Sequence, residues 1–424
     1  MKKIATSVLS LILCAGMLFA CTSCGNKIIA GDLTEGMLAR KVDGKPTDEA
    51  LATSYTVFAG KLLASLAEEG KNTLVSPLSV IIALSLAGNG AKGQTRDEIE
   101  ALLGSGAISL DDMNEYLYSY VQGLYDENNR YNTAKSKIKL ANSVWFREGF
   151  PVKETYLQKV TDYYLANAYE LPFDNAALKK INDWCAEKTD DMIKKVIDEI
   201  DPATMMYLIN ALLFEADWSD PYERSYPGTF TKADGTEQKA DMLCSTEYGY
   251  LETANAIGFV KPYEGWFDFV ALLPDEGVST AEVAKALTAG EFLSQVKQPD
   301  YAPELHVKIP KFEYDCGYTL NETLKALGIP TAFSQVDADF TDMADVNRER
   351  NNLYIGRVIH KTHIELSERG TKAAAVTAIE MKCGSAMPIE RKEINIFLDR
   401  PFVYAITDRK TGMPIFVGVV ETIK

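Results

Sequence analysis

Residues 368–379 read E-R-G-T-K-A-A-A-V-T-A-I, and this stretch decides the fold of the chain. In an extended strand, successive side chains point to opposite faces. One face then begins with Thr371, Ala373 and Ala375 and carries no charge as far as Cys383. The three charged residues of 371–383, Lys372, Glu380 and Lys382, all fall on the other face. Small, uncharged side chains on one face are typical of a strand that enters the middle of a close-packed sheet.

The alternative interpretation of this stretch is an Ala-rich surface helix. Val376, Thr377 and Ile379 weaken it, because β-branched side chains favour strands. The residues that follow, 384–392, have the Gly, Ser and Pro content of a loop, and a strand pattern resumes near Ile394. The pattern therefore predicts a strand that is attached to an exposed loop.

Composition predicts one large globular domain. The chain has 424 residues, 46% of them hydrophobic, and no Gly/Pro/Ser-rich linker after residue 48. We therefore expect a single domain over 48–424. The net charge of the whole chain, −16, disfavours binding to nucleic acid or to anionic lipid surfaces.

The N-terminus predicts a bacterial lipoprotein. Residues 1–20 combine two lysines with an apolar run, as in a secretory signal peptide, and end in Leu18-Phe19-Ala20-Cys21, which fits a lipoprotein cleavage site. A short membrane anchor is the alternative. We expect a lipid on Cys21, with Cys24 as the fallback, and a polar tether over 21–47. The expected location is the cell envelope, as an outer-membrane lipoprotein facing the periplasm or the cell surface, with the lipid as the only membrane contact.

Helical and strand patterns occupy different halves of the chain. Helices are expected from Asp48 to Gly70 and over 77–88, 95–103, 111–125, 153–164 and 176–197. Strands are expected over 141–146, 205–214, 269–273, 305–314, 402–407 and 415–420. This separation predicts an α+β class rather than alternating α/β.

No pattern of catalytic or metal-binding residues stands out. The chain has three histidines, and His360 and His363 are expected on a strand, where a spacing of three puts them on opposite faces. There is no HExxH, GxSxG, P-loop or GxGxxG motif. The cysteine spacing implies no disulfide and no zinc cluster. We therefore expect no enzyme activity, no metal and no cofactor, with a surface-anchored hydrolase as a remote alternative.

Sequence blocks along 50–420 resemble the serpin family of protease inhibitors. The resemblance lies in their order and spacing: N-T-L-V-S-P-L-S-V from 72, G-A-K-G-Q-T from 90, N-D-W from 182, L-I-N-A-L-L-F from 208 with Trp218, P-Y at 262, L-L-P from 272, I-P-K-F from 309, L-G-I from 327, and E-R-G-T with A-A-A-V-T from 368, then D-R-P-F from 399. Ala216 departs from the glycine usual in the family.

The resemblance implies the serpin fold, with mixed β-sheets, about eight to nine helices and an exposed reactive-centre loop. It also implies inhibition by a suicide-substrate mechanism. A serine or cysteine protease attacks the loop and forms an acyl-enzyme. The cut loop then inserts into a sheet and traps the protease. The expected partner is thus a target protease, and the expected state is a monomer.

The resemblance also assigns roles to residues. The hinge comprises Glu368, Gly370, Thr371, Ala373, Ala374, Ala375 and Thr377. Counting 16 positions on from Glu368 places the reactive bond between Gly384 and Ser385, with Met381, Lys382 and Cys383 as alternatives. The gate of the sheet comprises Lys311, Ser76, Ser79, Asn210, Trp218 and His360. We expect an ion pair between Lys311 and Glu368 and a hydrogen-bonded cluster of Ser76, Ser79, Asn210 and His360.

A serpin-fold binding protein or surface scaffold without inhibitory function is the main alternative. The hinge distinguishes the two, because a charged or bulky residue at position 371 would block insertion. Its small, uncharged residues favour inhibition.

Overall fold

The computed structural model describes residues 31–130, 136–164, 166–201, 204–286, 291–350, 352–371 and 391–423. Across these ranges the chain forms nine α-helices: α1 (Glu49–Leu66), α2 (Pro77–Gly88), α3 (Gly93–Gly104), α4 (Leu110–Arg130), α5 (Glu154–Tyr164), α6 (Asn175–Lys188), α7 (Thr280–Ala286), α8 (Glu291–Lys297) and α9 (Asn321–Ala326). A short 3-10 helix covers Thr331–Phe333.

In the same ranges the chain forms three β-sheets, whose strands lie side by side in the order named. Sheet A contains β11 (Phe312–Thr319), β12 (Arg357–Leu366), β13 (Gly370–Thr371), β4 (Met206–Asp217), β2 (Ser136–Arg147) and β3 (Asn167–Leu171). Sheet B contains β1 (Thr73–Val75), β16 (Pro414–Val420), β15 (Phe402–Asp408), β9 (Phe267–Pro274), β8 (Ala256–Pro262) and β7 (Gly249–Glu252). Sheet C contains β14 (Glu393–Phe397), β10 (Glu304–Pro310), β6 (Glu237–Glu247) and β5 (Ser225–Thr231). The predicted α+β class and the mixed sheets are confirmed.

Side-chain caps begin the first two helices where the sequence predicts them. The Asp48 carboxylate accepts from the amide of Leu51 at the start of α1. The Ser76 hydroxyl accepts from the amide of Ser79, and Pro77 occupies the first turn of α2. Each cap satisfies a backbone donor that the helix leaves unpaired. All twelve residues of α2 are buried, so this helix forms the centre of the main core.

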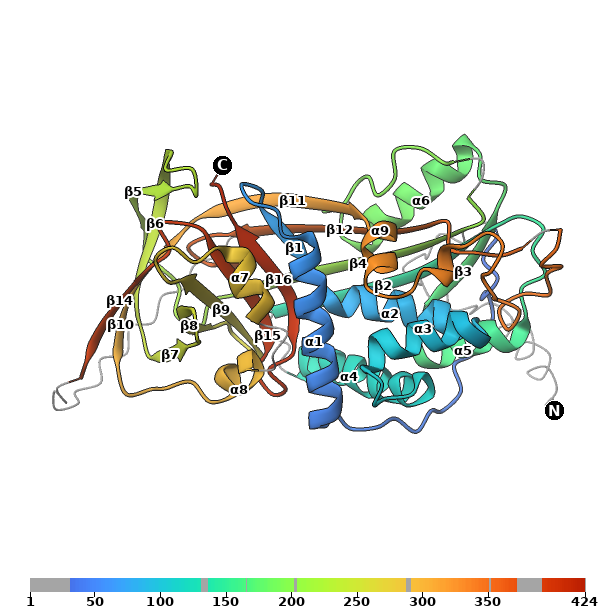
Figure 1. The fold of residues 1–424 in the computed structure, drawn as a ribbon, viewed down its shortest axis with the longest axis horizontal. Coiled ribbons are helices and arrows are strands. Elements are labelled where there is room, and N and C mark those ends of the chain that lie inside the picture. Colours follow the sequence, from blue (N-terminus) through green and yellow to red (C-terminus); the bar gives the residue numbers. More distant parts are fainter. Residues whose placement is uncertain are drawn as a thin grey trace, which may run out of the picture.

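Helices cover both faces of sheet A. Figure 1 shows α6 on one side of the sheet and α2 on the other. Under α6 a separate core forms around Trp145 of β2, whose ring lies 5.9 Å from the ring of Trp184 in α6. The larger core joins α1 and α2 to the inner faces of sheets A and B. Sheet A is thus held between two packed layers.

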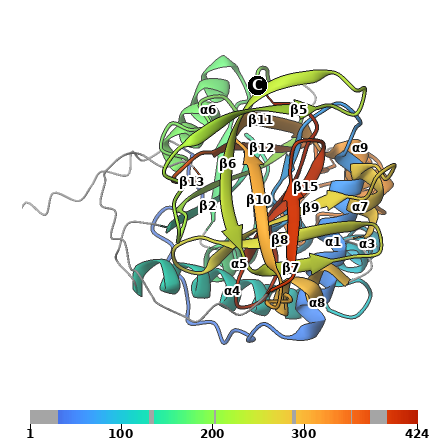
Figure 2. The ribbon, with the colours of Figure 1, turned by 90° about the vertical axis from the view of Figure 1, so that its left-hand side faces the viewer.

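Sheet C forms one end of the molecule. It lies at the left of Figure 1 and faces the viewer in Figure 2, where β6 and β10 cross in front of strands of sheet B. Parallel pairing of β14 with β10 begins at Glu393, directly after the expected loop.

Two expected elements are interrupted in the structure. The strand expected over 305–314 is two strands, β10 and β11, which belong to different sheets and meet at Lys311. The helix expected over 176–197 ends at Lys188. There the Thr189 hydroxyl bonds Cys185 and Ile193, and Asp190 and Asp191 have positive φ. The spacing of hydrophobic residues does not reveal that the backbone leaves the helical conformation at Thr189.

The described part of the expected tether contacts the domain. The amide of Leu33 donates to Ala168 in β3 at 2.8 Å, and the guanidinium of Arg40 lies 3.2 Å from Asp162. None of the helices in the described ranges is long and apolar enough to cross a membrane. Cys185, Cys244 and Cys316 are free thiols.

Candidate functional site

Sheet A contains an opening between β4 and β12. These strands pair directly and in parallel at one end, where His360 lies opposite Asn210. At the other end β13 lies between them, and Thr371 pairs with Leu366 of β12 and with Ala216 of β4. A strand between two neighbours holds them about 10 Å apart, twice the spacing of a direct pair. The two strands therefore diverge from His360 toward Leu366, and β13 occupies the wide end.

Gly370 begins β13 in a conformation that favours glycine. Its φ is +154°, and a Cβ built there would lie 2.0 Å from the carbonyl oxygen of Ala216. A larger residue would clash with the backbone of β4. The glycine of the expected hinge thus lets the chain approach β4 closely enough to pair.

Thr371 is already part of the sheet. Its side chain is buried, with 3% exposed, and its hydroxyl lies 2.6 Å from the hydroxyl of Tyr263. The ring of Tyr263 stacks on Trp218, with the centroids 4.2 Å apart and the planes at 6°. Burial raises the pKa of Tyr263 well above its usual range, so its hydroxyl keeps its proton. The first small residue of the hinge therefore has a prepared binding position.

Trp218 also holds the turn that precedes β13. Its indole Nε1 donates to the carbonyl of Ser367 at 3.0 Å, and its backbone amide donates to Arg369 at 2.6 Å. The amide of Tyr222 donates to the carbonyl of Glu368 at 2.9 Å. Trp218, expected as a gate residue, is thus the residue that joins the end of β4 to the hinge.

The expected ion pair between Lys311 and Glu368 is present in the structure. Lys311 Nζ lies 2.9 Å from Glu368 Oε1, and both side chains are about one-third exposed. Burial alone would raise the pKa of Glu368, but the hydrogen bond and charge of Lys311 bring it below its ordinary value. Lys311 reaches this place because it stands at the corner between sheets C and A. The pair therefore links that corner to the turn before β13.

His360 lies at the closed end of the opening and is buried. Its Nε2 accepts a hydrogen bond from the amide of Ser76 at 3.0 Å, so the neutral ring carries its proton on Nδ1. Burial lowers the pKa of His360 to about 4. Because Ser76 also caps α2, this contact connects β12 to the central helix of the core.

The expected cluster of four gate residues is only partly assembled. Ser76, Ser79 and His360 are joined by the two bonds already described. Asn210 instead donates to Asn142, its neighbour on β2. The buried Asn210 Oδ1 and Ser79 Oγ have no hydrogen-bond partner in the described part of the chain. Asn210 and Asn142 therefore form a separate hydrogen-bonded pair, and sequence motifs did not point to Asn142.

Sequence reasoning also missed a buried pair behind Trp218. Lys261 Nζ lies 2.7 Å from Glu247 Oε1, and the lysine side chain is 2% exposed. The ammonium group also lies over the rings of Trp218 and Tyr222. One signal in the sequence could have revealed this pair. Lys261 is a charged residue inside an otherwise apolar strand, β8, directly before the P-Y motif that contains Tyr263.

Several predicted site residues lie outside the described ranges. These are the lipidation candidates Cys21 and Cys24, the hinge residues Ala373, Ala374, Ala375 and Thr377, and the reactive-bond candidates Met381, Lys382, Cys383, Gly384 and Ser385. Their roles stay predictions.

Comparison with known proteins gives the family. A model of "Serpin (serine protease inhibitor)" matches residues 53–423, which is most of the chain and contains the whole opening of sheet A. The chain belongs to the serpin family. An uncharacterized serpin-like protein of Thermococcus kodakarensis is 29% identical over 88% of this chain and 85% of its own.

Solved serpin structures superpose on nearly the whole domain. The thermophilic serpin tengpin in its native state has a TM-score of 0.84 at 38% identity, covering 93% of this chain and 99% of its own. The latent state of tengpin has a TM-score of 0.76 at 37% identity, covering 90% and 100%. Thyroxine-binding globulin in complex with thyroxine has a TM-score of 0.76 at 22% identity, covering 88% and 99%, which shows the fold alone.

Proposed function

We propose that this serpin is an inhibitor of serine endopeptidases that acts by loop cleavage, acyl-enzyme trapping and strand insertion, with cysteine endopeptidases as a second candidate class of target. The observation that carries the proposal is the place of Thr371, which is buried between Leu366 and Ala216 at the wide end of the opening. A strand that already begins at this position needs only to extend toward His360. The greater similarity to native than to latent tengpin supports a state in which the loop has not yet inserted.

The residues of the opening would act at separate steps. The Lys311–Glu368 pair and Trp218 hold the turn before β13 while the loop is intact. After cleavage, the strand would advance between β12 and β4 and separate the direct pair of His360 with Asn210. The backbone hydrogen bonds of a new central strand, and the burial of its small side chains, stabilise the inserted state. Insertion moves the attached protease before the acyl-enzyme is hydrolysed.

The reactive bond is proposed between Gly384 and Ser385. Met381, Lys382 and Cys383 are the alternatives, and they would change the class of protease. Lys382 would direct the loop to trypsin-like enzymes, whereas Met381 or Cys383 would direct it to elastase- or chymotrypsin-like enzymes. These residues lie outside the described ranges.

The test is to mix the purified protein with trypsin-, elastase-, subtilisin- and papain-like proteases. We expect a covalent complex that survives SDS with at least one of them. The matched variant is Thr371→Arg, whose long charged side chain does not fit the buried position next to Tyr263. It should be cleaved without forming a complex, while keeping the circular dichroism of the parent. Cleavage of the parent by every protease of the panel without a complex would favour a non-inhibitory binding protein.

We also propose that the mature protein is a monomer anchored to the cell envelope by a lipid on Cys21, with Cys24 as the fallback site. The support is the sequence of the N-terminal 24 residues. Metabolic labelling with a tagged fatty acid, compared between Cys21→Ser and Cys24→Ser, tests it. If the label persists in both single variants, neither Cys21 nor Cys24 is the required lipidation site, and the proposal is contradicted.

A further inference from the structure

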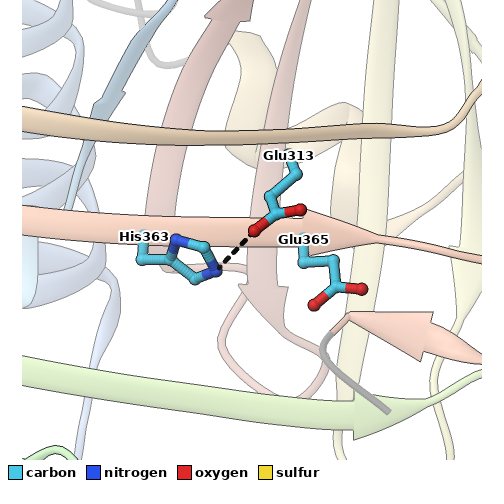
Figure 3. Close-up of side chains that lie close together, drawn as sticks. All are labelled: Glu313, His363 and Glu365. Carbon is cyan, nitrogen blue, oxygen red and sulfur yellow. Dashed lines mark ion pairs between the residues drawn. The ribbon is translucent and has the colours of Figure 1, made fainter. Parts of the chain in front are cut away.

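Four ionisable side chains gather on the outer face of sheet A. β11 and β12 pair in antiparallel register, with Glu313 opposite Glu365 and Asp315 opposite His363. Their neighbours in sequence point into the core, so these four side chains share the other face. Figure 3 shows Glu313 and His363 pointing toward each other, with Glu365 beside them. The cluster thus draws one imidazole and three carboxylates from two neighbouring strands.

The imidazole of His363 is oriented by a carboxylate. Its Nδ1 lies 2.9 Å from Asp315 Oδ1, and because a carboxylate only accepts, Nδ1 carries the proton of the neutral ring. Nε2 then keeps its lone pair and lies 4.0 Å from Glu313 Oε1, beyond hydrogen-bond distance. Protein histidines that bind metals are commonly oriented in this way, with the second nitrogen donating to a carboxylate. Asp315 therefore directs the free nitrogen toward the two glutamates.

The two glutamates face each other without a balancing cation. Like charges directly opposite in an antiparallel pair destabilise it. In the described ranges, no lysine or arginine forms an ion pair with Glu313 or Glu365, and the nearby Lys311 pairs with Glu368. Ligand atoms of Glu313, His363 and Glu365 all lie within 4.8 Å of one another. A cation bound between Glu313, His363 and Glu365 would offset the repulsion between the two carboxylates. It would also be coordinated by the lone pair on Nε2 of His363.

There is also room for an ion and its water. Glu313 and Glu365 line one end of a cavity of about 880 Å³ that is open to solvent, between the ends of β11 and β12 and the strands β5 and β6. His363 is not part of its lining, and Lys239 and Lys311 are. The side chain of Glu313 is 65% exposed and that of His363 is 14% exposed. An ion can therefore enter without unfolding of the sheet.

We propose that Glu313, His363 and Glu365 bind a zinc-type transition-metal ion, with Asp315 orienting the histidine. One imidazole nitrogen and two carboxylates suit zinc and leave a fourth position for water. Calcium and magnesium prefer oxygen ligands alone, so they should bind more weakly. Tetrahedral zinc places its ligands about 3.3 Å apart, and rotation of the exposed Glu313 and the half-buried Glu365 would bring their carboxylates to that spacing.

The proposed site differs from the expectation that the chain binds no metal. His360 and His363 lie on opposite faces of β12, as their spacing predicts. That expectation considered ligand partners on the same strand only. The partners of His363 come from β11, about 50 positions away in sequence, and only the register of the two strands shows them.

The experiment is a titration of the purified full chain with zinc chloride, by calorimetry and by competition with a chromophoric chelator. We expect one additional zinc ion on the parent relative to His363→Ala and Glu365→Gln, and affinity about 10- to 100-fold lower for Asp315→Asn. The matched control is His306→Ala. His306 is an exposed histidine on β10 with a single carboxylate, Glu393, 3.6 Å away, so its loss should leave binding unchanged.

Two measurements keep the test decisive. Melting curves in EDTA should be the same for the parent and His363→Ala, which shows that the variant is folded. Substitution with cobalt(II) should give visible absorption of a tetrahedral site in the parent and not in His363→Ala. The proposal is overturned if the parent and His363→Ala bind zinc equally, or if magnesium and calcium bind the parent as tightly as zinc. Because binding is measured without a protease, the result is independent of the inhibitory function.

Discussion

The hydroxyl of Thr371 lies 2.6 Å from the hydroxyl of Tyr263, and both side chains are buried at the wide end of the opening in sheet A. This contact joins Thr371 to the aromatic stack of Tyr263 and Trp218. The described start of the expected hinge, as far as Thr371, is therefore part of the folded domain.

A double-mutant cycle measures this contact. Thr371→Val and Tyr263→Phe each leave a buried hydroxyl without its partner, and each should lower the free energy of unfolding by about 1–3 kcal/mol. The double variant should be more stable than either single variant, because it leaves no orphaned hydroxyl. Thr371→Ser, which keeps the hydroxyl, is the control. Urea unfolding gives the values, and simple additivity would show that the two groups do not interact.

Charge reversal at Glu368 tests the ion pair at the gate. Glu368→Lys places two cations together and removes a partly buried pair, at a cost on the order of 1–3 kcal/mol. We expect the turn before β13 to release and the variant to form polymers on mild heating, seen by native electrophoresis. The swapped variant Lys311→Glu/Glu368→Lys restores opposite charges and should stay monomeric. A single variant that remained monomeric and fully inhibitory would refute this role.

The buried His360 predicts a pH dependence of stability. Above pH 6.5 the ring is neutral in both the folded and the unfolded chain, so it contributes no slope. Between pH 6.5 and about 4 the unfolded chain takes up a proton that the folded chain does not, so the free energy of unfolding falls as pH falls. Below about pH 4 both states are protonated and the loss levels off, at about 3 kcal/mol.

The control for this prediction is His360→Gln, which removes the titration but keeps a side-chain acceptor for the amide of Ser76. Urea unfolding of the parent and the variant at pH 7.5 and pH 4.5 gives the difference in slope. The parent should lose more stability than the variant. Equal losses would mean that other groups dominate the acid response.

Cleavage within 381–385 should make the protein more heat-resistant. The new strand would add a ladder of backbone hydrogen bonds to sheet A, whereas a nick in an ordinary globular domain lowers stability. Mass spectrometry should find a C-terminal fragment that begins at or near Ser385. The fragment should stay bound until denaturation, because β15 pairs with β9 and β16 pairs with β1. A melting temperature that is unchanged or lower after a single cut would exclude insertion.

Some features of the gate could be predicted from sequence, and others could not. Lys311 and Glu368 were paired through their places in family motifs, and the structure puts them 2.9 Å apart. Asn210 was assigned to His360, its parallel neighbour, yet its side chain bonds Asn142 on the other side. Motifs locate a polar residue on a strand, but the choice between two neighbouring strands depends on side-chain packing.

The sequence by itself determined the features whose cause lies within a few residues. Asp48 and Ser76 begin helices through their own side chains, and the small residues from Thr371 onward predict a strand that can insert into a sheet. Tertiary structure alone decided which distant groups meet. Tyr263 contacts Thr371 across 108 positions, and His363 lies beside Glu313 because β11 and β12 pair in one register. Strand register between remote segments follows from the packing of the whole core, which no local pattern encodes.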